Sequence, residues 1–287
     1  MKKSKIRVYL DYMIYNKIQE QGNVKKFANF NCNYYLSVNH IEEYYKAKVN
    51  DLQDENAIKL DSVKSIMQQL SPNGILNPQK GLRIIHKRES FDDCLMRIKQ
   101  YNTQNIIEDT SIINQEIQAQ KSKELQKVNK ENTNNSNLNY EEIWNVAAVK
   151  EQIEKYTWPT TKEYYKLPFS FYGSRTKKLF NSYHVPDFSF QYATYSVMEN
   201  NFQWLELAID ELNHILCECG YHRDREKRAG KSGAYDVANM IYSTYCNYFV
   251  TDDKNLIPRA KAIFYYLKIP TEVLTLDKFL EKMEPSI

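Results

Sequence analysis

Short apolar runs alternate with longer amphipathic stretches over the last third of the chain. Residues 248–251 and 271–274 are short apolar runs bounded by polar residues, a pattern typical of buried strands. Residues 234–246, 256–267 and 277–283 carry apolar side chains at helical spacing, so we predict a helix in each. Strands that alternate with helices in this way imply a parallel sheet with both faces covered.

The amino-terminal part of the chain begins with the same alternation. Residues 6–10 are predicted to form a strand that ends at Asp11, and residues 12–15 could open a helix. A short extended piece at 34–37 leads into a predicted helix at 38–52, because apolar residues then recur at helical spacing. A second strand followed directly by a helix is again what a parallel sheet requires.

Between these two regions the pattern is weaker. Residues 57–70 and 90–101 are predicted helices, and residues 82–85 are a candidate strand. Gln, Lys, Glu and Asn dominate residues 115–139, which we expect to form an exposed helix that dissolves into a mobile loop. Residues 157–195 are rich in aromatic residues and contain three prolines, so we expect an ordered but irregular segment.

Residues 199–219 carry the strongest helical pattern in the chain. The apolar positions that repeat at helical period are Phe202, Leu205, Ala208, Ile209, Leu212, Ile215 and Leu216. We therefore predict an α/β protein with a three-layer α/β/α architecture, a parallel sheet and a large helical insertion. Residues 1–287 would form a single domain, with the core from about 1–100 and 200–287 and a helical, partly irregular insertion at 101–199.

Composition narrows the class of protein. Apolar residues make up 42% of the 287 residues and charged residues 26%, which is ordinary for a globular protein. No apolar run approaches the roughly 18 residues that a membrane span needs, and the amino-terminal segment does not have the pattern of a secretory signal. The five cysteines are an odd number in a long chain, so we expect free thiols in the cytoplasm. The net charge of +3 neither requires nor opposes a nucleic-acid partner.

Acidic residues follow two of the predicted strands. Asp11 ends the first strand, and Asp252 and Asp253 come directly after the strand at 248–251. Open parallel sheets bind their ligands outside the carboxyl ends of the strands. Acids from the two ends of the chain are therefore expected to meet at one edge of the sheet.

Three further acids lie near the predicted starts of helices, namely Glu42, Glu43 and Asp236. The helix dipole favours a carboxylate at such a position, which explains each of them singly. It does not explain why acids also end strands at both extremes of the chain. Converging carboxylates repel one another, and a divalent cation relieves this repulsion. Mg²⁺ and Mn²⁺ prefer oxygen ligands and promote phosphodiester hydrolysis, so these acids favour a nuclease.

Two motifs near the amino terminus resemble those of PIN domains, a family of metal-dependent ribonucleases with a Rossmann-like α/β/α fold. Residues 8–15, Val-Tyr-Leu-Asp-Tyr-Met-Ile-Tyr, resemble the first strand of the family and the aspartate that follows it. Residues 37–43 resemble the family's serine-led helix, in which an acid stands six residues after the serine. That spacing favours Glu43 over Glu42 as the acid of this motif.

Two further motifs near the carboxyl terminus continue this resemblance. Residues 236–242 resemble the helix that carries the third acid of PIN domains. Residues 249–256 resemble the final strand, followed by Thr251, a variable residue and an aspartate. This order favours Asp253 over Asp252 as the aspartate of the motif. The likeness covers roughly residues 5–50 and 230–285, and the chain is much longer than a PIN domain.

The resemblance implies a site and an activity. The implied ligands of one or two Mg²⁺ or Mn²⁺ ions are Asp11, Glu43, Asp236 and Asp253, with Asp252, Thr251 and Glu42 as accessory residues. The implied reaction is cleavage of single-stranded RNA, with DNA less favoured, by a water molecule activated at the metal. The family's settings include toxin–antitoxin pairs and anti-phage defence, so a protein regulator or a homo-oligomer is an expected partner. The alternative is a catalytically inactive PIN-like module that binds nucleic acid or protein.

Basic residues precede the predicted helix that carries Asp236. They are Arg223, Arg225, Lys227, Arg228 and Lys231. They could neutralise the phosphates of a nucleic acid, although a solvated loop explains them equally well. Lys254 stands beside the last acid, where it could contact a phosphate or pair with Asp252.

A zinc site is the remaining candidate for a metal centre. Its residues would be His214, Cys217, Cys219 and His222. Two cysteines two residues apart do not face the same way on a helix, and the paired spacing of structural zinc sites is absent. We therefore expect buried thiols here instead of ligands.

Overall fold

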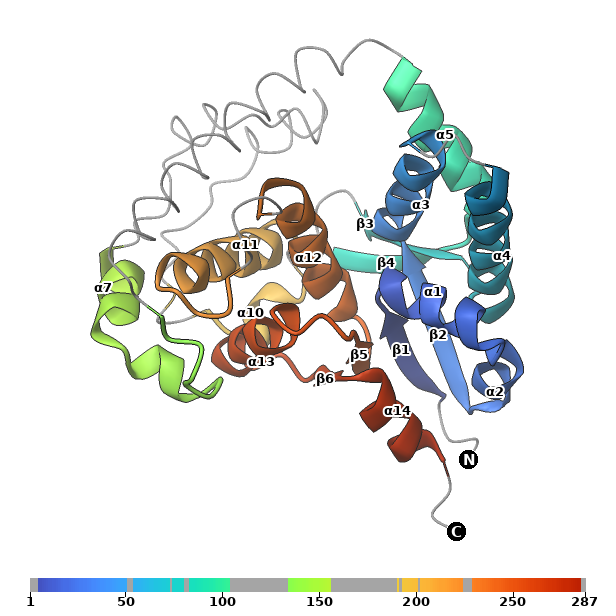
Figure 1. The fold of residues 1–287 in the computed structure, drawn as a ribbon. Coiled ribbons are helices and arrows are strands. Elements are labelled where there is room, and N and C mark those ends of the chain that lie inside the picture. Colours follow the sequence, from blue (N-terminus) through green and yellow to red (C-terminus); the bar gives the residue numbers. More distant parts are fainter. Residues whose placement is uncertain are drawn as a thin grey trace.

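The computed structural model describes residues 5–50, 54–72, 74–79, 83–103, 134–155, 190, 193–200, 202–223 and 229–284. In this part of the chain, six strands form one sheet between two layers of helices (Figure 1). The strands are β1 (Ile6–Leu10), β2 (Cys32–Ser37), β3 (Ile75–Gln79), β4 (Arg83–Lys87), β5 (Tyr248–Val250) and β6 (Glu272–Leu274). The predicted α/β class is confirmed.

The strand order is β4-β3-β2-β1-β5-β6. All neighbouring strands are parallel except β3 and β4, which are antiparallel, so the prediction of a wholly parallel sheet is wrong at this edge. Only residues 80–82 separate β3 from β4, and so short a connection can join antiparallel strands but not parallel ones. The parallel strands, counted along the chain, stand in the order 3-2-1-4-5, as in doubly wound nucleotide-binding sheets, and the order reverses between β1 and β5.

Each face of the sheet packs against its own group of helices. In β1, Tyr9 contributes to one hydrophobic core while Val8 and Leu10 contribute to the other, because successive side chains of a strand point to opposite faces. Phe249 and Val250 divide in the same way in β5. The sheet is therefore the middle layer of three, as predicted.

The helices sort into these two layers along the chain. The Tyr9 face is covered by η1 (Glu142–Asn145), α7 (Ala147–Lys155), α10 (Tyr195–Met198), α11 (Phe202–Glu218), α12 (Ala229–Ser243) and α13 (Leu256–Leu267). The Val8 face is covered by α1 (Tyr12–Gln21), α2 (Val24–Asn29), α3 (Val38–Asn50), α4 (Asp54–Leu70), α5 (Phe91–Thr103) and α14 (Leu276–Met283). Figure 1 shows the two groups on either side of the strands.

Part of the predicted insertion belongs to the core. Trp144 in η1 is buried, and its Nε1 donates a hydrogen bond to the carbonyl oxygen of Ala262 at 3.1 Å. Asn135 donates to the carbonyl oxygen of Cys219 at 2.6 Å, so the end of the polar stretch predicted to be mobile is tied to α11. Residues 104–133 and 156–189, which contain the rest of the expected exposed helix and most of the aromatic segment, lie outside the described residues.

Among the helices that the structure describes, none combines the length and the apolar character needed to cross a membrane.

Candidate functional site

The candidate site lies at the carboxyl edge of the sheet between β1 and β5, where the strand order reverses. Asp11 follows β1 directly, and its backbone N–H donates to the carbonyl oxygen of Val250 at 2.9 Å. Thr251 follows β5, and its hydroxyl donates to Asp11 Oδ2 at 2.6 Å across 240 residues of sequence. Asp11 is only 7% exposed. The parallel pairing of β1 with β5 thus fixes a buried carboxylate at this edge, which we call the switch-point edge.

Two asparagines connect Asp11 to Glu43. The Nδ2 of Asn239 donates to Asp11 Oδ1 at 3.3 Å, and its Oδ1 accepts from Asn39 Nδ2 at 2.7 Å. Asn39 Nδ2 also donates to Glu43 Oε1 at 3.0 Å. Asn239 and Asn39 are 3% and 5% exposed, and we call them the amide pair. Asn239 therefore holds Asp11, Asn39 holds Glu43, and the two amides also hold each other.

A buried tyrosine holds the amide pair, and a buried histidine fixes the backbone next to it. Tyr9 donates its hydroxyl to Asn239 Oδ1 at 2.9 Å and lies 2.7 Å from Ser37 Oγ. His40 Nδ1 accepts from the backbone N–H of Ser37 at 3.0 Å, while Nε2 lies 2.7 Å from the carbonyl oxygen of Leu10. A carbonyl oxygen only accepts, so Nε2 carries the proton. Burial lowers the pKa of His40 to about 4, so this histidine is a neutral structural residue.

The sequence did not point to the residues that support the acids. Asn39 stands four residues before Glu43, and Asn239 stands three residues after Asp236. Residues three or four apart lie on the same face of a helix, and this spacing is the signal that could have found the amide pair.

Burial and the charges of neighbouring acids raise the pKa of two carboxyl groups at this edge, those of Glu43 and Asp11. Burial raises the pKa of Glu43 to about 9, and the nearby charges of Asp11 and Asp236 contribute, with Lys46 opposing them. Burial also raises the pKa of Asp11 to about 6, opposed by the Thr251 hydrogen bond and supported by the charge of Asp253. Asp11 and Asp236 therefore lie within electrostatic reach of Glu43, and Asp253 lies within reach of Asp11, although these acids come from different parts of the chain.

Asp236 differs from the other acids because it is neutralised. Its Oδ2 forms an ion pair with Arg259 Nη2 at 3.0 Å, and Arg259 is only 1% exposed. Arg259 also donates to Asn213 Oδ1 at 3.0 Å and to the carbonyl oxygen of Asn255 at 3.2 Å. The arginine thereby joins α11, α12 and the start of α13, and Asp236 completes that cluster.

Glu42, Glu43 and Asp236 do not stand at helix starts, so the interpretation of these three acids as helix caps is wrong. Helix α12 begins at Ala229, five residues before the predicted start, so Asp236 lies in the middle of the helix. Helix α3 begins at Val38, and its first turn contains no acid, so Glu42 and Glu43 also lie beyond the helix start. The dipole of a helix end therefore does not account for them.

The structure assigns different contacts to Asp252 and Asp253. Asp252 Oδ2 pairs with Lys17 Nζ at 2.7 Å, and its Oδ1 accepts from the backbone N–H of Leu276 at 2.9 Å. Asp253 Oδ1 accepts from the backbone N–H groups of Asn255 and Leu256, both at 2.8 Å, and so caps α13. Asp252 is thus tied to α1 and α14, whereas Asp253 is the acid whose charge reaches Asp11.

Glu42 lies on the side of α3 that faces α5. Burial raises its pKa, opposed by the charges of Lys46 and Arg97. Arg97 itself pairs with Glu89 at 2.9 Å. Glu42 therefore lies in a more cationic environment than Glu43, which agrees with Glu43 as the residue nearer to the other acids.

The donor chemistry at the switch-point edge fits a hard divalent cation. Asp11, Glu43 and Asp253 offer only oxygen atoms, and none of the three forms an ion pair with a described residue. Asp253 Oδ2 and Glu43 Oε2 accept no hydrogen bond from the described part of the chain. Across the same residues, no three His, Cys, Asp or Glu side chains stand together closely enough to hold an ion.

The basic residues are only partly described. Arg223 is half-buried, and its Nη1 finds no hydrogen-bond acceptor among the described residues. Lys254 is exposed beside Asp253, and Asp252 pairs with Lys17 instead of with Lys254. Arg225, Lys227 and Arg228, together with the side chain of Lys231, lie outside the described residues.

The residues of the candidate zinc site make other contacts instead of forming a metal centre. His214 Nε2 lies 2.8 Å from Glu218 Oε1, and Cys217 Sγ accepts from Arg259 at 3.3 Å. Cys219 is buried, and all five cysteines are free thiols, as expected.

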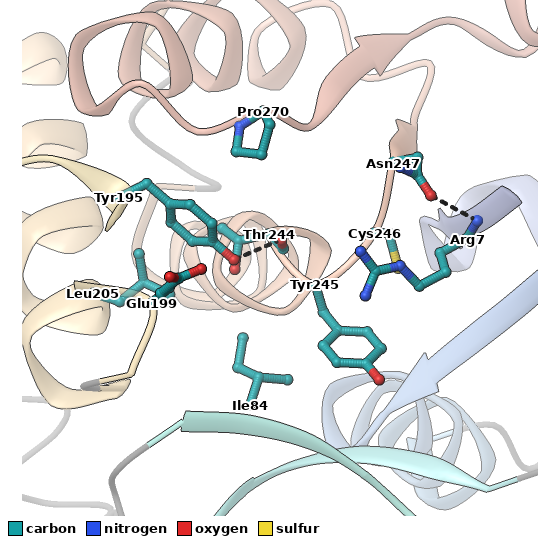
Figure 2. Close-up of a pocket in the computed structure, with 10 residues that line it drawn as sticks. All are labelled: Arg7, Ile84, Tyr195, Glu199, Leu205, Thr244, Tyr245, Cys246, Asn247 and Pro270. Atoms are coloured by element: carbon teal, nitrogen blue, oxygen red, sulfur yellow. Dashed lines mark hydrogen bonds between the residues drawn. The ribbon is translucent and has the colours of Figure 1, made fainter. Parts of the chain in front are cut away.

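A concavity lies at the opposite edge of the sheet. It measures about 320 Å³, and Arg7, Asn247 and Pro270 line it at the amino ends of β1, β5 and β6 (Figure 2). Its two charged groups, Arg7 and Glu199, are both exposed. Water therefore solvates these charges, and this concavity does not show the buried, interacting acids that make the switch-point edge a functional candidate.

Comparison with protein-family models, with curated proteins and with solved structures found no match to this chain.

Proposed function

We propose that this protein is a metal-dependent nuclease that cleaves the phosphodiester bonds of single-stranded RNA, with DNA as the less favoured substrate. One observation carries the proposal: Asp11 and Glu43 are largely buried, the charge of Asp11 adds to the raised pKa of Glu43, and neutral amides hold both carboxyl groups. Carboxylates in such an arrangement attract a divalent cation, which relieves their repulsion. The resemblance of the sequence to PIN-domain ribonucleases supports the same class of activity.

The residues proposed to bind Mg²⁺ or Mn²⁺ are Asp11, Glu43 and Asp253, and the proposal requires these three side chains to draw closer together around the ion than they stand in the described structure. When bound, such an ion supplies Lewis-acid chemistry that activates water and stabilises the leaving oxygen. The amide pair orients Asp11 and Glu43, and the Thr251 hydroxyl fixes the second oxygen of Asp11. We assign Asp236 to holding Arg259 and to the electrostatic field of the site, because its Oδ2 is engaged by the guanidinium.

The same proposal covers the partner and the setting. Lys254 and Arg223 are the described cations proposed to contact the backbone phosphates of the substrate, because phosphate contacts position a nucleic acid without reading its sequence. The five free thiols fit the reducing environment of the cytoplasm. A toxin or anti-phage effector controlled by a protein regulator is the setting that the family resemblance implies.

Cleavage of end-labelled single-stranded RNA in Mn²⁺, with EDTA as the blank, tests the proposal. Asp11→Asn and Glu43→Gln should each reduce cleavage on the order of 10²- to 10³-fold, because each removes a ligand worth several kcal/mol of transition-state stabilisation. Glu20→Gln is the matched control, since Glu20 is an acid whose carboxylate pairs with Lys59 on the surface of α1. RNA left intact by the wild type in Mn²⁺, or cut equally by all variants, would exclude the nuclease.

A catalytically inactive module that binds nucleic acid or protein is the second candidate. The ion pair between Asp236 and Arg259 favours it, because an acid in an ion pair is a poor metal ligand. This candidate predicts that the wild type binds RNA without cutting it, and that Asp11→Asn and Asp253→Asn leave binding unchanged.

A further inference from the structure

The exposed side of α13 carries lysines and a tyrosine but no acid. Lys261 and Tyr265 stand four residues apart, so they lie on one face of the helix, and α13 contains no Asp or Glu. Lys254 precedes the helix at the switch-point edge, and Lys268 follows its last turn. Seven residues separate each lysine from the next, which amounts to about two helical turns. The four residues therefore follow one another along the helix, and we call them the α13 stripe.

The lysines of the stripe have no acidic partner. None of the three forms an ion pair or a side-chain hydrogen bond with a described residue, whereas Lys59 in the opposite helical layer pairs with Glu20 at 2.7 Å. Lys254 and Lys268 are exposed to solvent. Cations gathered along one helix face without acids are the electrostatic footprint of a protein that binds nucleic acid.

The central lysine of the stripe also stands near a second cation. Lys261 is half-buried, and burial, followed by the charge of Lys278 in α14, lowers its pKa. Glu272 opposes this shift, but its carboxylate is engaged by Lys282. A bound anion would relieve the repulsion between the two ammonium groups.

Tyr265 is exposed where most large rings of this protein are buried. Its exposed fraction is 52%, and its ring stands edge-to-face against that of Tyr140, with the ring centres 5.7 Å apart and the planes at 70°. Tyr140 is itself 37% exposed. An accessible aromatic ring among cations is the combination with which proteins bind single-stranded nucleic acid, because the ring stacks on an unpaired base.

We propose that the α13 stripe binds single-stranded RNA that extends from the switch-point edge, with its lysines against backbone phosphates and Tyr265 stacked on a base. This inference rests on the proposed function for its substrate and adds the path that the strand follows away from the acids. The stripe spans about 14 residues of helical rise, or roughly 21 Å. Duplex RNA keeps its bases stacked on one another, so Tyr265 favours a single strand.

Exposed substitutions test the stripe with little change to the fold. The probe is a fluorescein-labelled single-stranded RNA of about 12 nucleotides, a length that such binding sites span, followed by anisotropy in EDTA. Tyr265→Ala should lower the affinity about 5- to 100-fold, whereas Tyr265→Phe should bind as the wild type does because stacking is retained. Lys261→Gln should reduce the slope of log affinity against log salt by about 0.7, the loss of one phosphate contact.

Lys268→Gly separates binding from stability. Lys268 has a φ of 56°, a left-handed conformation that glycine adopts without strain at the end of a helix. This variant should therefore unfold at the same or a higher temperature than the wild type while its salt slope falls by about 0.7. Lys59→Gln is the matched control: it removes the same charge from α4, so it should keep the affinity and the slope of the wild type.

The outcomes separate this inference from the proposed function. A wild type that binds no single-stranded RNA, or variants of the stripe that all bind it as the wild type does, would overturn the stripe. Equal losses in Lys59→Gln would also overturn it, as would binding of anionic phospholipid vesicles in place of RNA. A wild type that binds RNA through the stripe but leaves it intact in Mn²⁺ would support this inference and refute the nuclease.

Discussion

The raised pKa of Glu43 predicts that the metal-free protein loses stability as the pH rises. The carboxyl group titrates at about 9 in the folded state and at 4.5 when unperturbed. Between these values the folded state binds a proton that the unfolded state has released, so the free energy of unfolding falls with increasing pH. Asp11 adds a smaller loss between its unperturbed value of 3.8 and about 6.

The contribution of Glu43 follows from one proton, and Glu206, whose pKa burial raises to about 8, adds a loss of the same sign. Glu43 gives a slope of at most about 1.4 kcal/mol per pH unit, so between pH 6 and pH 8 it costs at most about 2.7 kcal/mol. Urea unfolding in EDTA at pH 6, 7 and 8 measures this loss directly. Glu43→Gln carries a neutral group of the same shape, so it should reduce the slope by the share of Glu43, leave the share of Glu206, and be more stable than the wild type at pH 8.

A matched control and a metal titration complete this test. Glu20→Gln removes an exposed carboxylate whose pKa is lowered by Lys59, so it should retain the slope of the wild type. Mn²⁺ at a hundred times its dissociation constant should restore about 2.7 kcal/mol at pH 8, because it binds only the folded, deprotonated site. Stability that rises with pH, or a Glu43→Gln variant that keeps the slope of the wild type, would refute the reasoning.

Three further substitutions test the structure around the site. Arg259→Met should cost about 3–5 kcal/mol in urea unfolding because it leaves the Asp236 carboxylate without its cation, and adding Asp236→Asn should recover part of the loss. Gly74→Ala should lower the unfolding temperature and the hydrogen-exchange protection of β4, because the new methyl group would collide with the Lys87 carbonyl oxygen at a positive φ. Trp144→Phe should cost on the order of 1 kcal/mol in urea unfolding through the lost hydrogen bond to α13, and an unchanged midpoint would contradict that contact.

The elements that form the middle of the sheet could be predicted because their sequences are locally unambiguous. The run at Ile6–Leu10 is apolar except for Arg7 and is bounded by charge, and the seven apolar positions of α11 are all buried in the structure. The short strand β3 was missed, because its Asn77 and Pro78 are poor strand residues. Its pairing with β2 and β4 supplies the stability that its composition does not indicate.

The candidate site was predictable only where it depends on topology. Asp11 and Asp253 follow strands, and parallel strands place such residues at one edge. The start of α12 was misplaced because residues 229–233, Ala-Gly-Lys-Ser-Gly, contain two glycines and have low helix propensity. The position of each asparagine three or four residues from an acid could have been noticed, but the contact between Asn39 and Asn239 could not be predicted, because it joins side chains 200 residues apart in the sequence.

The pairing of β1 with β5 also has a consequence during synthesis of the chain. Asp11 leaves the ribosome 240 residues before Thr251, which supplies the hydrogen bond that fixes it. At about 5–20 residues per second this interval lasts roughly 10–50 s. The nascent polypeptide therefore exposes an unpaired edge of its central strand throughout that time, and it cannot assemble the acidic edge until β5 and Thr251 have been synthesised.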